Sequence, residues 1–184
     1  MKREEALIFL KKNLQNKNLF NHSLAVEAAM IGLAKHFDED IGKWGLAGLL
    51  HDIDYEETKD DPGRHGLKSL EILKECNLAE DILNAISSHN EMTGVSKQTL
   101  MAKALFCVDQ LTGLIVASTL VLPSKKIEAL QVKSVLNKFK EKSFAKGAKR
   151  ENILLCETDL NTKVEDFVLI TLKAMQGISA EIGL

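Results

Sequence analysis

The stretch that decides how this sequence folds runs from residue 45 to residue 54, Gly-Leu-Ala-Gly-Leu-Leu-His-Asp-Ile-Asp. Its small and apolar residues predict the end of a helix from about Asp40 to Asp52. Adjacent side chains cannot share one face in the middle of a helix. At a helix end, where the backbone departs from regularity, His51 and Asp52 can both reach one ion. The stretch therefore indicates a helical fold with a polar pair at one helix end.

Helical periodicity extends along the chain on both sides of this stretch. The first expected helix ends near residues 13–18. The following ones cover about 22–37, 40–52, 67–73, 78–86 and 96–122. Shorter basic helices are expected up to about residue 156, and a last helix over 164–182. Pro123 ends the longest of them. The chain has 11 Gly, 2 Pro and no alternating strand of useful length, which disfavours a sandwich or barrel of many short strands. The sequence predicts an all-α fold of about seven to nine helices.

Length and composition indicate one compact domain over residues 1–184, with 45% apolar and 27% charged residues. A net charge of −2 gives no argument for a nucleic-acid or membrane partner. The longest uncharged stretch, residues 110–124, is too short to span a bilayer, and the N-terminus does not resemble a signal peptide. Three widely spaced cysteines are expected to be buried, reduced thiols. We therefore expect a cytoplasmic protein.

Charge is distributed unevenly along the chain. Residues 38–61 carry nine acidic and two basic side chains, whereas residues 125–150 carry nine basic and two acidic ones. Either run is explained by a solvated helix face. Alternatively, the acidic region supplies metal ligands and the basic region attracts an anionic substrate.

Polar residues recur at positions that should face the core. His22 shares a helical stripe with apolar residues, His89 lies on an apolar face, and Asp109 interrupts the long apolar helix. A carboxylate on such a face costs several kcal/mol unless it is paired or bound to a cation. Each residue alone could be a satisfied core side chain. Four histidines and two aspartates together suit a site for Zn, Fe, Ni, Co or Mn.

The order of these residues along the chain resembles that of a known family. His22, the pair His51-Asp52, His65, His89 and Asp109 occur in an order that resembles the HD superfamily of metal-dependent phosphohydrolases. The stretch His51-Asp52-Ile53-Asp54 is similar to its His-Asp-Ile-Gly variant, with Asp54 where Gly is usual, a departure we expect to be harmless. The resemblance covers roughly residues 19–120, and residues 124–184 form a basic helical extension similar to that of small bacterial predicted HD hydrolases.

The resemblance implies a set of metal ligands. His22, His51, Asp52 and Asp109 match the ligands of a first ion. His65 and His89 match the extra ligands of a second ion, with Asp52 bridging. If His65 faces solvent instead, the site reduces to one ion. The implied cofactor is one or two divalent ions of Mn, Fe, Ni, Co, Zn or Mg, and His36 has no place in the pattern and is expected to be structural.

The implied activity is hydrolysis of a small phosphate ester, a nucleotide or similar metabolite, by a metal-activated water, with Asp52 as the catalytic proton acceptor. Candidate substrate-binding residues are Arg64, Lys142, Lys146 and Arg150, the last three lying on one face if their segment is helical. Two alternatives remain open: a di-iron oxygenase of the same superfamily, and a non-catalytic metal- or ligand-binding module. Aromatic residues make up only 5% of the chain, so no nucleic-acid polymer is expected. No membrane partner is expected, and the C-terminal helix could support a homodimer.

Overall fold

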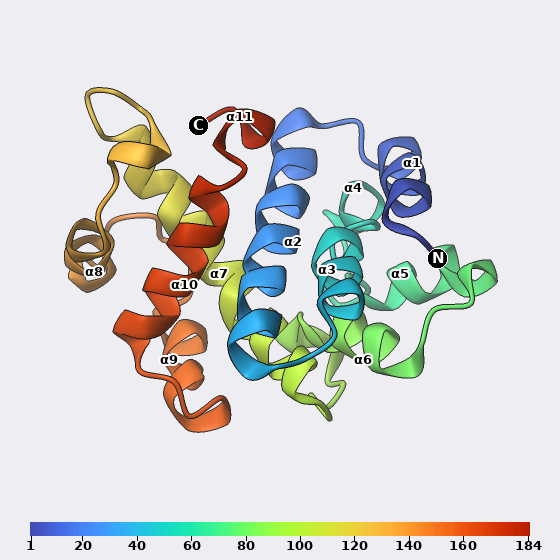
Figure 1. Ribbon diagram of the computed structural model, residues 1–184. Coiled ribbons are helices and arrows are strands. Elements are labelled where there is room, and N and C mark those ends of the chain that lie inside the picture. The colour runs from blue at the N-terminus through green and yellow to red at the C-terminus, as the bar shows by residue number, and fades with distance from the viewer.

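The computed structural model describes all residues 1–184 as helices joined by loops, with no strand (Figure 1). Eight helices have seven or more residues, which confirms the all-α prediction of seven to nine. They are α1 (Arg3–Asn13), α2 (Lys17–Phe37), α3 (Ile41–Leu50), α6 (Glu80–Ser88), α7 (Leu100–Leu120), α8 (Val132–Lys140), α9 (Arg150–Asp159) and α10 (Val164–Gln176). Shorter helices are α4 (Tyr55–Thr58), α5 (Leu67–Ile72) and α11 (Ser179–Ile182), with single 3₁₀ turns η1 (Lys74–Cys76), η2 (Glu91–Thr93) and η3 (Ile127–Ala129).

Short polar side chains set where the site-bearing helices begin. The side chain of Asn16 accepts hydrogen bonds from the first backbone amides of α2, Asp40 does the same for α3, and Thr99 for α7. The last predicted helix is interrupted: the amide of Gly177 bonds back to the carbonyls of Lys173 and Ala174, which closes α10 before the separate turn α11. The predicted stripe over residues 164–182 is therefore divided between two helices.

Helix α2 lies in the middle of the molecule, between α3 and α10 (Figure 1). Helices α2 and α3 approach closely at Gly48, where an added Cβ would lie 2.8 Å from the carbonyl oxygen of Val26 and 3.0 Å from the backbone of Glu27. Only glycine permits this contact without displacement of one helix. The contact fixes the end of α3 beside α2.

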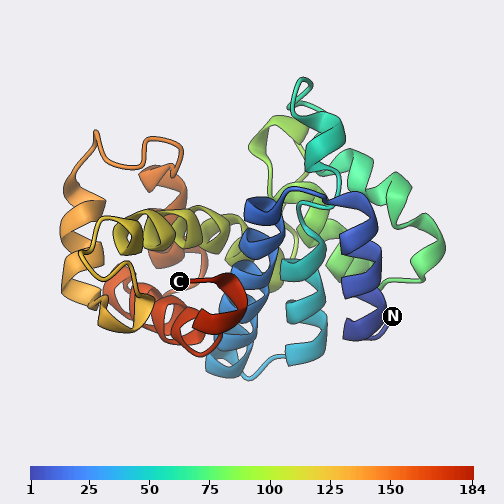
Figure 2. The same ribbon diagram turned by 90° about the horizontal axis from the view of Figure 1, so that it is seen from above.

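Helix α7 runs from the side of α1–α6 into the C-terminal helices α8–α10 (Figure 2). By length and composition it could cross a membrane, in contrast to the expectation from residues 110–124. In this fold 13 of its 21 residues are buried, and the apolar ones among them belong to one core of 41 buried apolar residues that extends from Ala6 to Ile182. Helix α7 is thus a largely buried core helix of this fold.

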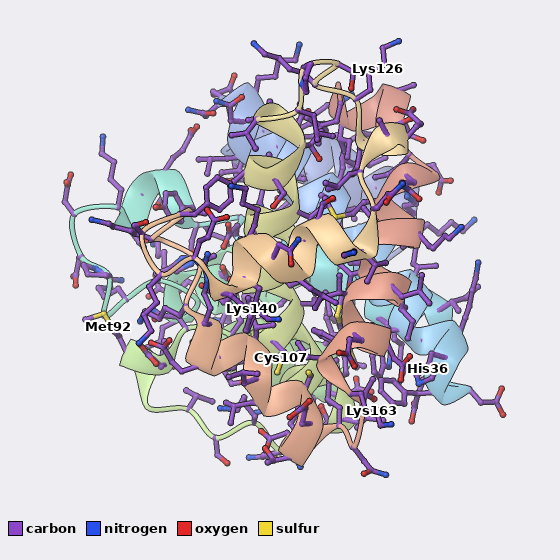
Figure 3. The ribbon with its side chains drawn as sticks, turned by 90° about the vertical axis from the view of Figure 1, so that its left-hand side faces the viewer. His36, Met92, Cys107, Lys126, Lys140 and Lys163 are labelled. Atoms are coloured by element: carbon purple, nitrogen blue, oxygen red, sulfur yellow. The ribbon has the colours of Figure 1, made fainter.

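The three cysteines are unpaired, and two of them are buried. Burial raises the pKa values of Cys107 and Cys156 to about 12, which keeps both thiols protonated and unreactive. Cys107 lies behind α9 inside the molecule, whereas Met92 and Lys126 lie at its edge (Figure 3). Cys76 differs from the expectation because it is only half-buried.

Candidate metal centre

The pair His51-Asp52 at the end of α3 forms the middle of the site, and both side chains are buried. Nδ1 of His51 lies 2.8 Å from the carbonyl oxygen of Gly48 and donates to it. This contact turns Nε2 away from the helix, toward the two carboxylates. Nε2 is buried and has no hydrogen-bond partner. A buried ring nitrogen without a hydrogen-bond partner is unfavourable unless a cation or another polar group meets it.

His22, Asp52 and Asp109 surround this nitrogen. Nε2 of His51 lies 3.2 Å from Oδ1 of Asp52 and 3.6 Å from Oδ1 of Asp109. Nε2 of His22 lies 2.8 Å from Oδ1 of Asp109 and 3.7 Å from Oδ2 of Asp52. These are the four residues predicted for a first ion, and they come from α2, the end of α3 and the middle of α7.

A second group meets at the same carboxylate. Nε2 of His65 and Nε2 of His89 lie 3.2 Å and 3.4 Å from Oδ1 of Asp52, and 3.0 Å from each other. Ligand atoms of Asp52, His65 and His89 lie close enough to hold an ion, as do those of His22, His51 and Asp52. Asp52 therefore belongs to both groups, which is the arrangement that a bridging carboxylate requires. His65 points into the site and not to solvent.

The outer nitrogen of each imidazole is held in place. Nδ1 of His89 lies 2.6 Å from the carbonyl oxygen of Ile86, and Nδ1 of His22 lies 3.5 Å from the hydroxyl of Thr112. Such contacts select the tautomer that presents Nε2 to a metal. The donor set of neutral imidazoles and carboxylates fits a divalent transition metal.

Asp54 holds His65, a role that the sequence analysis missed. Its buried carboxylate lies 2.8 Å from Nδ1 of His65 and accepts hydrogen bonds from the amides of Gly66 at 2.7 Å and Ser69 at 3.0 Å. The expectation that Asp54 is harmless is therefore incomplete: it is not among the ligands, but it fixes a ligand and the start of α5. The sequence did contain one indication of this role, a second aspartate two positions after Asp52 at the end of an apolar stretch.

Burial disfavours the charged form of each group in the site, but the attraction between the histidines and the aspartates has the larger effect on their pKa values. Burial lowers the pKa of His51, yet Asp52 and Asp109 raise that pKa well above its ordinary value. Burial likewise opposes ionisation of both aspartates, yet the neighbouring histidines hold the pKa values of Asp52 and Asp109 well below the ordinary value. The pKa of His65 is raised to about 9 by Asp52 and Asp54 against its burial. The carboxylates are thus ionised at neutral pH, as cation ligands must be.

A cavity of about 320 Å³ opens above these ligands. Five of the six predicted ligands line it, together with Leu19, Tyr55, Asn90, Glu91, Gln110, Lys149 and Asn152. A neighbouring cavity of about 300 Å³ shares His22, Asp109 and Gln110 and is otherwise lined by Gly113, Ala145, Gly147 and Ala148. A larger cavity of about 700 Å³ between α2 and α10 contains none of the predicted ligands.

The predicted substrate-binding residues do not line either cavity at the site. Arg64 is exposed and pairs with Glu71 at 3.0 Å, while Lys142 and Lys146 are exposed. The guanidinium of Arg150 donates to carbonyl oxygens of its own chain, including those of Phe144, Ala145 and Ala148. The spacing argument fails because α8 ends at Lys140 and α9 begins at Arg150. The segment between them is not helical.

For the other residues that line the cavity, the sequence contains little or no indication of a place near the site. Gln110 follows Asp109 in an otherwise apolar helix, and its Nε2 donates to Oδ2 of Asp109 at 2.8 Å. Lys149 lies in the basic run, but its position depends on where α9 begins. His36 is exposed in the last turn of α2, where its ring contacts Phe37, apart from the site as expected.

Comparison with known proteins agrees with this geometry. The HD domain family model matches residues 19–114. Ribonuclease Y of Lawsonia intracellularis is 29% identical over 146 residues, 78% of this chain and 28% of that protein. Ribonuclease Y of Nitratidesulfovibrio vulgaris is 33% identical over 98 residues, 53% of this chain and 18% of that protein. This chain thus spans less than a third of the length of these relatives.

A further relative has a length similar to that of this chain. An uncharacterized protein of Methanocaldococcus jannaschii is 28% identical over 172 residues, 88% of this chain and 98% of that protein. No solved structure matches this chain at a significant level.

Proposed function

The chain belongs to the HD domain family, and from this premise we propose that it is a metal-dependent phosphohydrolase acting on a small phosphate ester such as a nucleotide. One observation carries the proposal: four imidazoles and two carboxylates converge around Asp52, where Nε2 of His51 is buried without a partner. Structural histidines would be expected to satisfy such a nitrogen within the protein.

The residues around Asp52 would hold one or two divalent ions. His22, His51, Asp52 and Asp109 suit the first, and Asp52, His65 and His89 suit the second. When bound, such ions supply Lewis acidity, which lowers the pKa of a water and stabilises charge that develops on a phosphoryl group.

The chain's own groups would complete the reaction. Asp52 is kept ionised at neutral pH, so its carboxylate can accept a hydrogen bond, and in the reaction the proton, from the attacking water. Tyr55 packs edge-on against His65 with ring centroids 5.2 Å apart and lines the cavity beside it. The cavity walls would limit access of bulk water.

The size of the two cavities supports a small substrate. The phosphate would occupy the cavity of about 320 Å³, and the organic group would enter the cavity of about 300 Å³ beside it, whose far side is lined by Gly113, Ala145, Gly147 and Ala148. We propose that the protein acts in the cytoplasm, where its three unpaired cysteines stay reduced, without a membrane or nucleic-acid polymer as partner.

A second candidate substrate is the phosphodiester of RNA, which the identity to two proteins named Ribonuclease Y favours. A long polymer needs a track of basic groups beyond the reacting phosphate. The cavities at the site contain only one lysine and no arginine, which favours the small substrate.

The experiment begins with elemental analysis of the purified full chain. The metal-loaded protein is then assayed against nucleoside mono-, di- and triphosphates, dinucleoside polyphosphates and a short oligoribonucleotide. We expect phosphate release from a small ester and loss of both metal and activity in His51→Ala and Asp52→Ala. Retention of full metal content in both variants would show that the site is assigned wrongly.

Two further results would replace the proposed reaction. Substrate-dependent oxygen consumption by iron-loaded protein would favour an oxygenase. Absence of turnover across the whole panel, with metal bound, would favour a binding module.

A further inference from the structure

One cation lines the two cavities at the metal centre. Among all the lining residues, Lys149 is the only lysine or arginine. It comes from the C-terminal extension, outside the residues 19–114 that the family model matches. A positive side chain near the phosphate adds to the charge stabilisation that bound ions supply. Lys149 is the residue of this chain that is placed to act in this way.

The backbone of Lys149 is fixed relative to the ligands. Its amide donates to Oε1 of Gln110 at 3.0 Å, and Nε2 of Gln110 donates to Oδ2 of Asp109 at 2.8 Å. The preceding residues are held by the guanidinium of Arg150. The base of the side chain therefore has a set position, while its four-carbon stem stays free to move the ammonium group.

The ammonium group of Lys149 is paired with the carboxylate of Glu91, which also lines the cavity. Glu91 lies in the turn η2, two residues after the candidate ligand His89. The pair thus joins η2 to the start of α9 among the residues that line the cavity. Both side chains are about half exposed, at 47% and 48%, and such pairs exchange partners readily because water screens them.

The carboxylate of Glu91 occupies the position that suits an anion. Lys149 precedes the first residue of α9, a helix of 10 residues, and Asn152 lies three residues further along and also lines the cavity. The positive end of α9 and the ammonium group of Lys149 thus attract negative charge to one place.

We propose that Lys149 binds the phosphate of the substrate, and that Glu91 occupies Lys149 until the phosphate displaces it. This inference rests on the proposed function, because it takes the substrate to be a phosphate ester. A dianionic phosphate competes well against a single carboxylate for one ammonium group. Glu91 then swings away from the cavity toward solvent.

Equilibrium binding of inorganic phosphate to the manganese-loaded full chain tests the inference, by isothermal titration calorimetry. Lys149→Met should weaken binding by about tenfold, the loss typical of one hydrogen bond to a charged group. Lys149→Arg should restore most of the affinity. Glu91→Gln should tighten binding by about threefold or more, because Lys149 is then free in a larger fraction of molecules.

The matched control is Lys146→Met, which removes an exposed lysine of the same segment and should leave phosphate affinity unchanged. Metal content and melting temperature of each variant show whether folding and the ions are intact. Equal affinity of the wild type and Lys149→Met, weaker binding by Glu91→Gln, or an equal loss in Lys146→Met would overturn the inference.

The failures of this inference and of the proposed function are distinguishable. If Lys149→Met weakens phosphate binding but no ester in the panel is hydrolysed, the phosphate site stands and the hydrolase fails. If esters are hydrolysed with an unchanged KM in Lys149→Met, the hydrolase stands and the role of Lys149 fails.

Discussion

Nε2 of His22 lies 2.8 Å from Oδ1 of Asp109, although 87 positions separate the two residues in the chain. Each lies within a long helix, one in α2 and the other in α7. The aspartate that interrupts the apolar residues of α7 thus meets an imidazole inside the fold. Such a pair explains how a carboxylate is tolerated at that depth.

This pair leads to a prediction for Asp109→Asn. The substitution keeps the size of the side chain but removes the negative charge shared by His22 and His51. We expect metal content to fall by tenfold or more, as is roughly typical when a metal-site contact is lost, and activity to fall with it. Elemental analysis of dialysed protein measures the loss. Asp166→Asn, an exposed aspartate of α10, serves as control, and equal metal content in the two variants would remove Asp109 from the ligand set.

The role of Asp54 gives a second prediction. Asp54→Ala removes the partner of His65 and leaves the buried amides of Gly66 and Ser69 without an acceptor. We expect a loss of stability of about 1–3 kcal/mol for each unsatisfied group, and a loss of metal affinity of about 10–100-fold at the His65 side. Chemical denaturation and metal stoichiometry measure the two effects.

Asp54→Asn separates these effects because it keeps one acceptor oxygen for the amides. It should recover part of the stability but not the full affinity for a second ion. If Asp54→Asn equals the wild type in both stability and metal stoichiometry, Asp54 does not position His65.

The close contact of α2 and α3 gives a third prediction. Gly48→Ala places a Cβ 2.8 Å from the carbonyl oxygen of Val26, so the two helices must separate. We expect a destabilisation of about 1–3 kcal/mol, typical of overpacking, and weaker metal binding, because His22 and His51 lie on the separated helices.

The control for Gly48→Ala is Gly113→Ala in α7, where an added Cβ meets nothing within 4 Å. There alanine should stabilise the protein by up to about 1 kcal/mol, because it is the better helix former. Urea unfolding of both variants measures the change in the free energy of unfolding, which we expect to be a decrease for Gly48→Ala and an increase for Gly113→Ala. A Gly48→Ala protein as stable as the wild type would show that the helices can shift freely.

The raised pKa of His65 gives a fourth prediction, on pH. In the metal-free protein this pKa is about 9, above the ordinary value of about 6.5. The contribution of His65 to stability is therefore complete below pH 6.5 or so and is lost as pH rises toward 9. Metal binding needs neutral imidazole, so metal affinity should rise over the same interval.

Two measurements check this prediction. The melting temperature of metal-free protein should fall between about pH 6.5 and pH 9, while that of metal-loaded protein should fall less or rise. Calorimetry at pH 7 in buffers of different ionisation enthalpy should detect protons released on metal binding. Heats that do not depend on the buffer would contradict the protonation of the site.

The helical class and the ligand residues could be predicted from the sequence because their signals are local. Apolar periodicity predicts helices over α2, α3 and α7, and polar residues on those apolar faces mark side chains that need a partner inside the fold. Such signals mark His22, His89 and Asp109, and the full set of candidate ligands, with His51, Asp52 and His65, came from an order along the chain that resembles the HD superfamily. The break at Gly177 was missed because apolar spacing continues across it.

The surroundings of the ligands depended on tertiary structure. Whether Asp54 points to His65, and which lysine of the basic run faces the cavity, depends on how α5 and α9 begin and on which walls they meet. The segment between α8 and α9 is not helical, so helical spacing could not tell which basic residue faces the cavity, and Lys149, not Lys146 or Arg150, lines it. The basic residues of this segment follow one another too irregularly for the sequence to show which of them faces the site. The sequence by itself determined which residues are candidate metal ligands, whereas only the packing of α3, α7 and α9 decided which neighbours orient them, because those contacts join segments far apart in the chain.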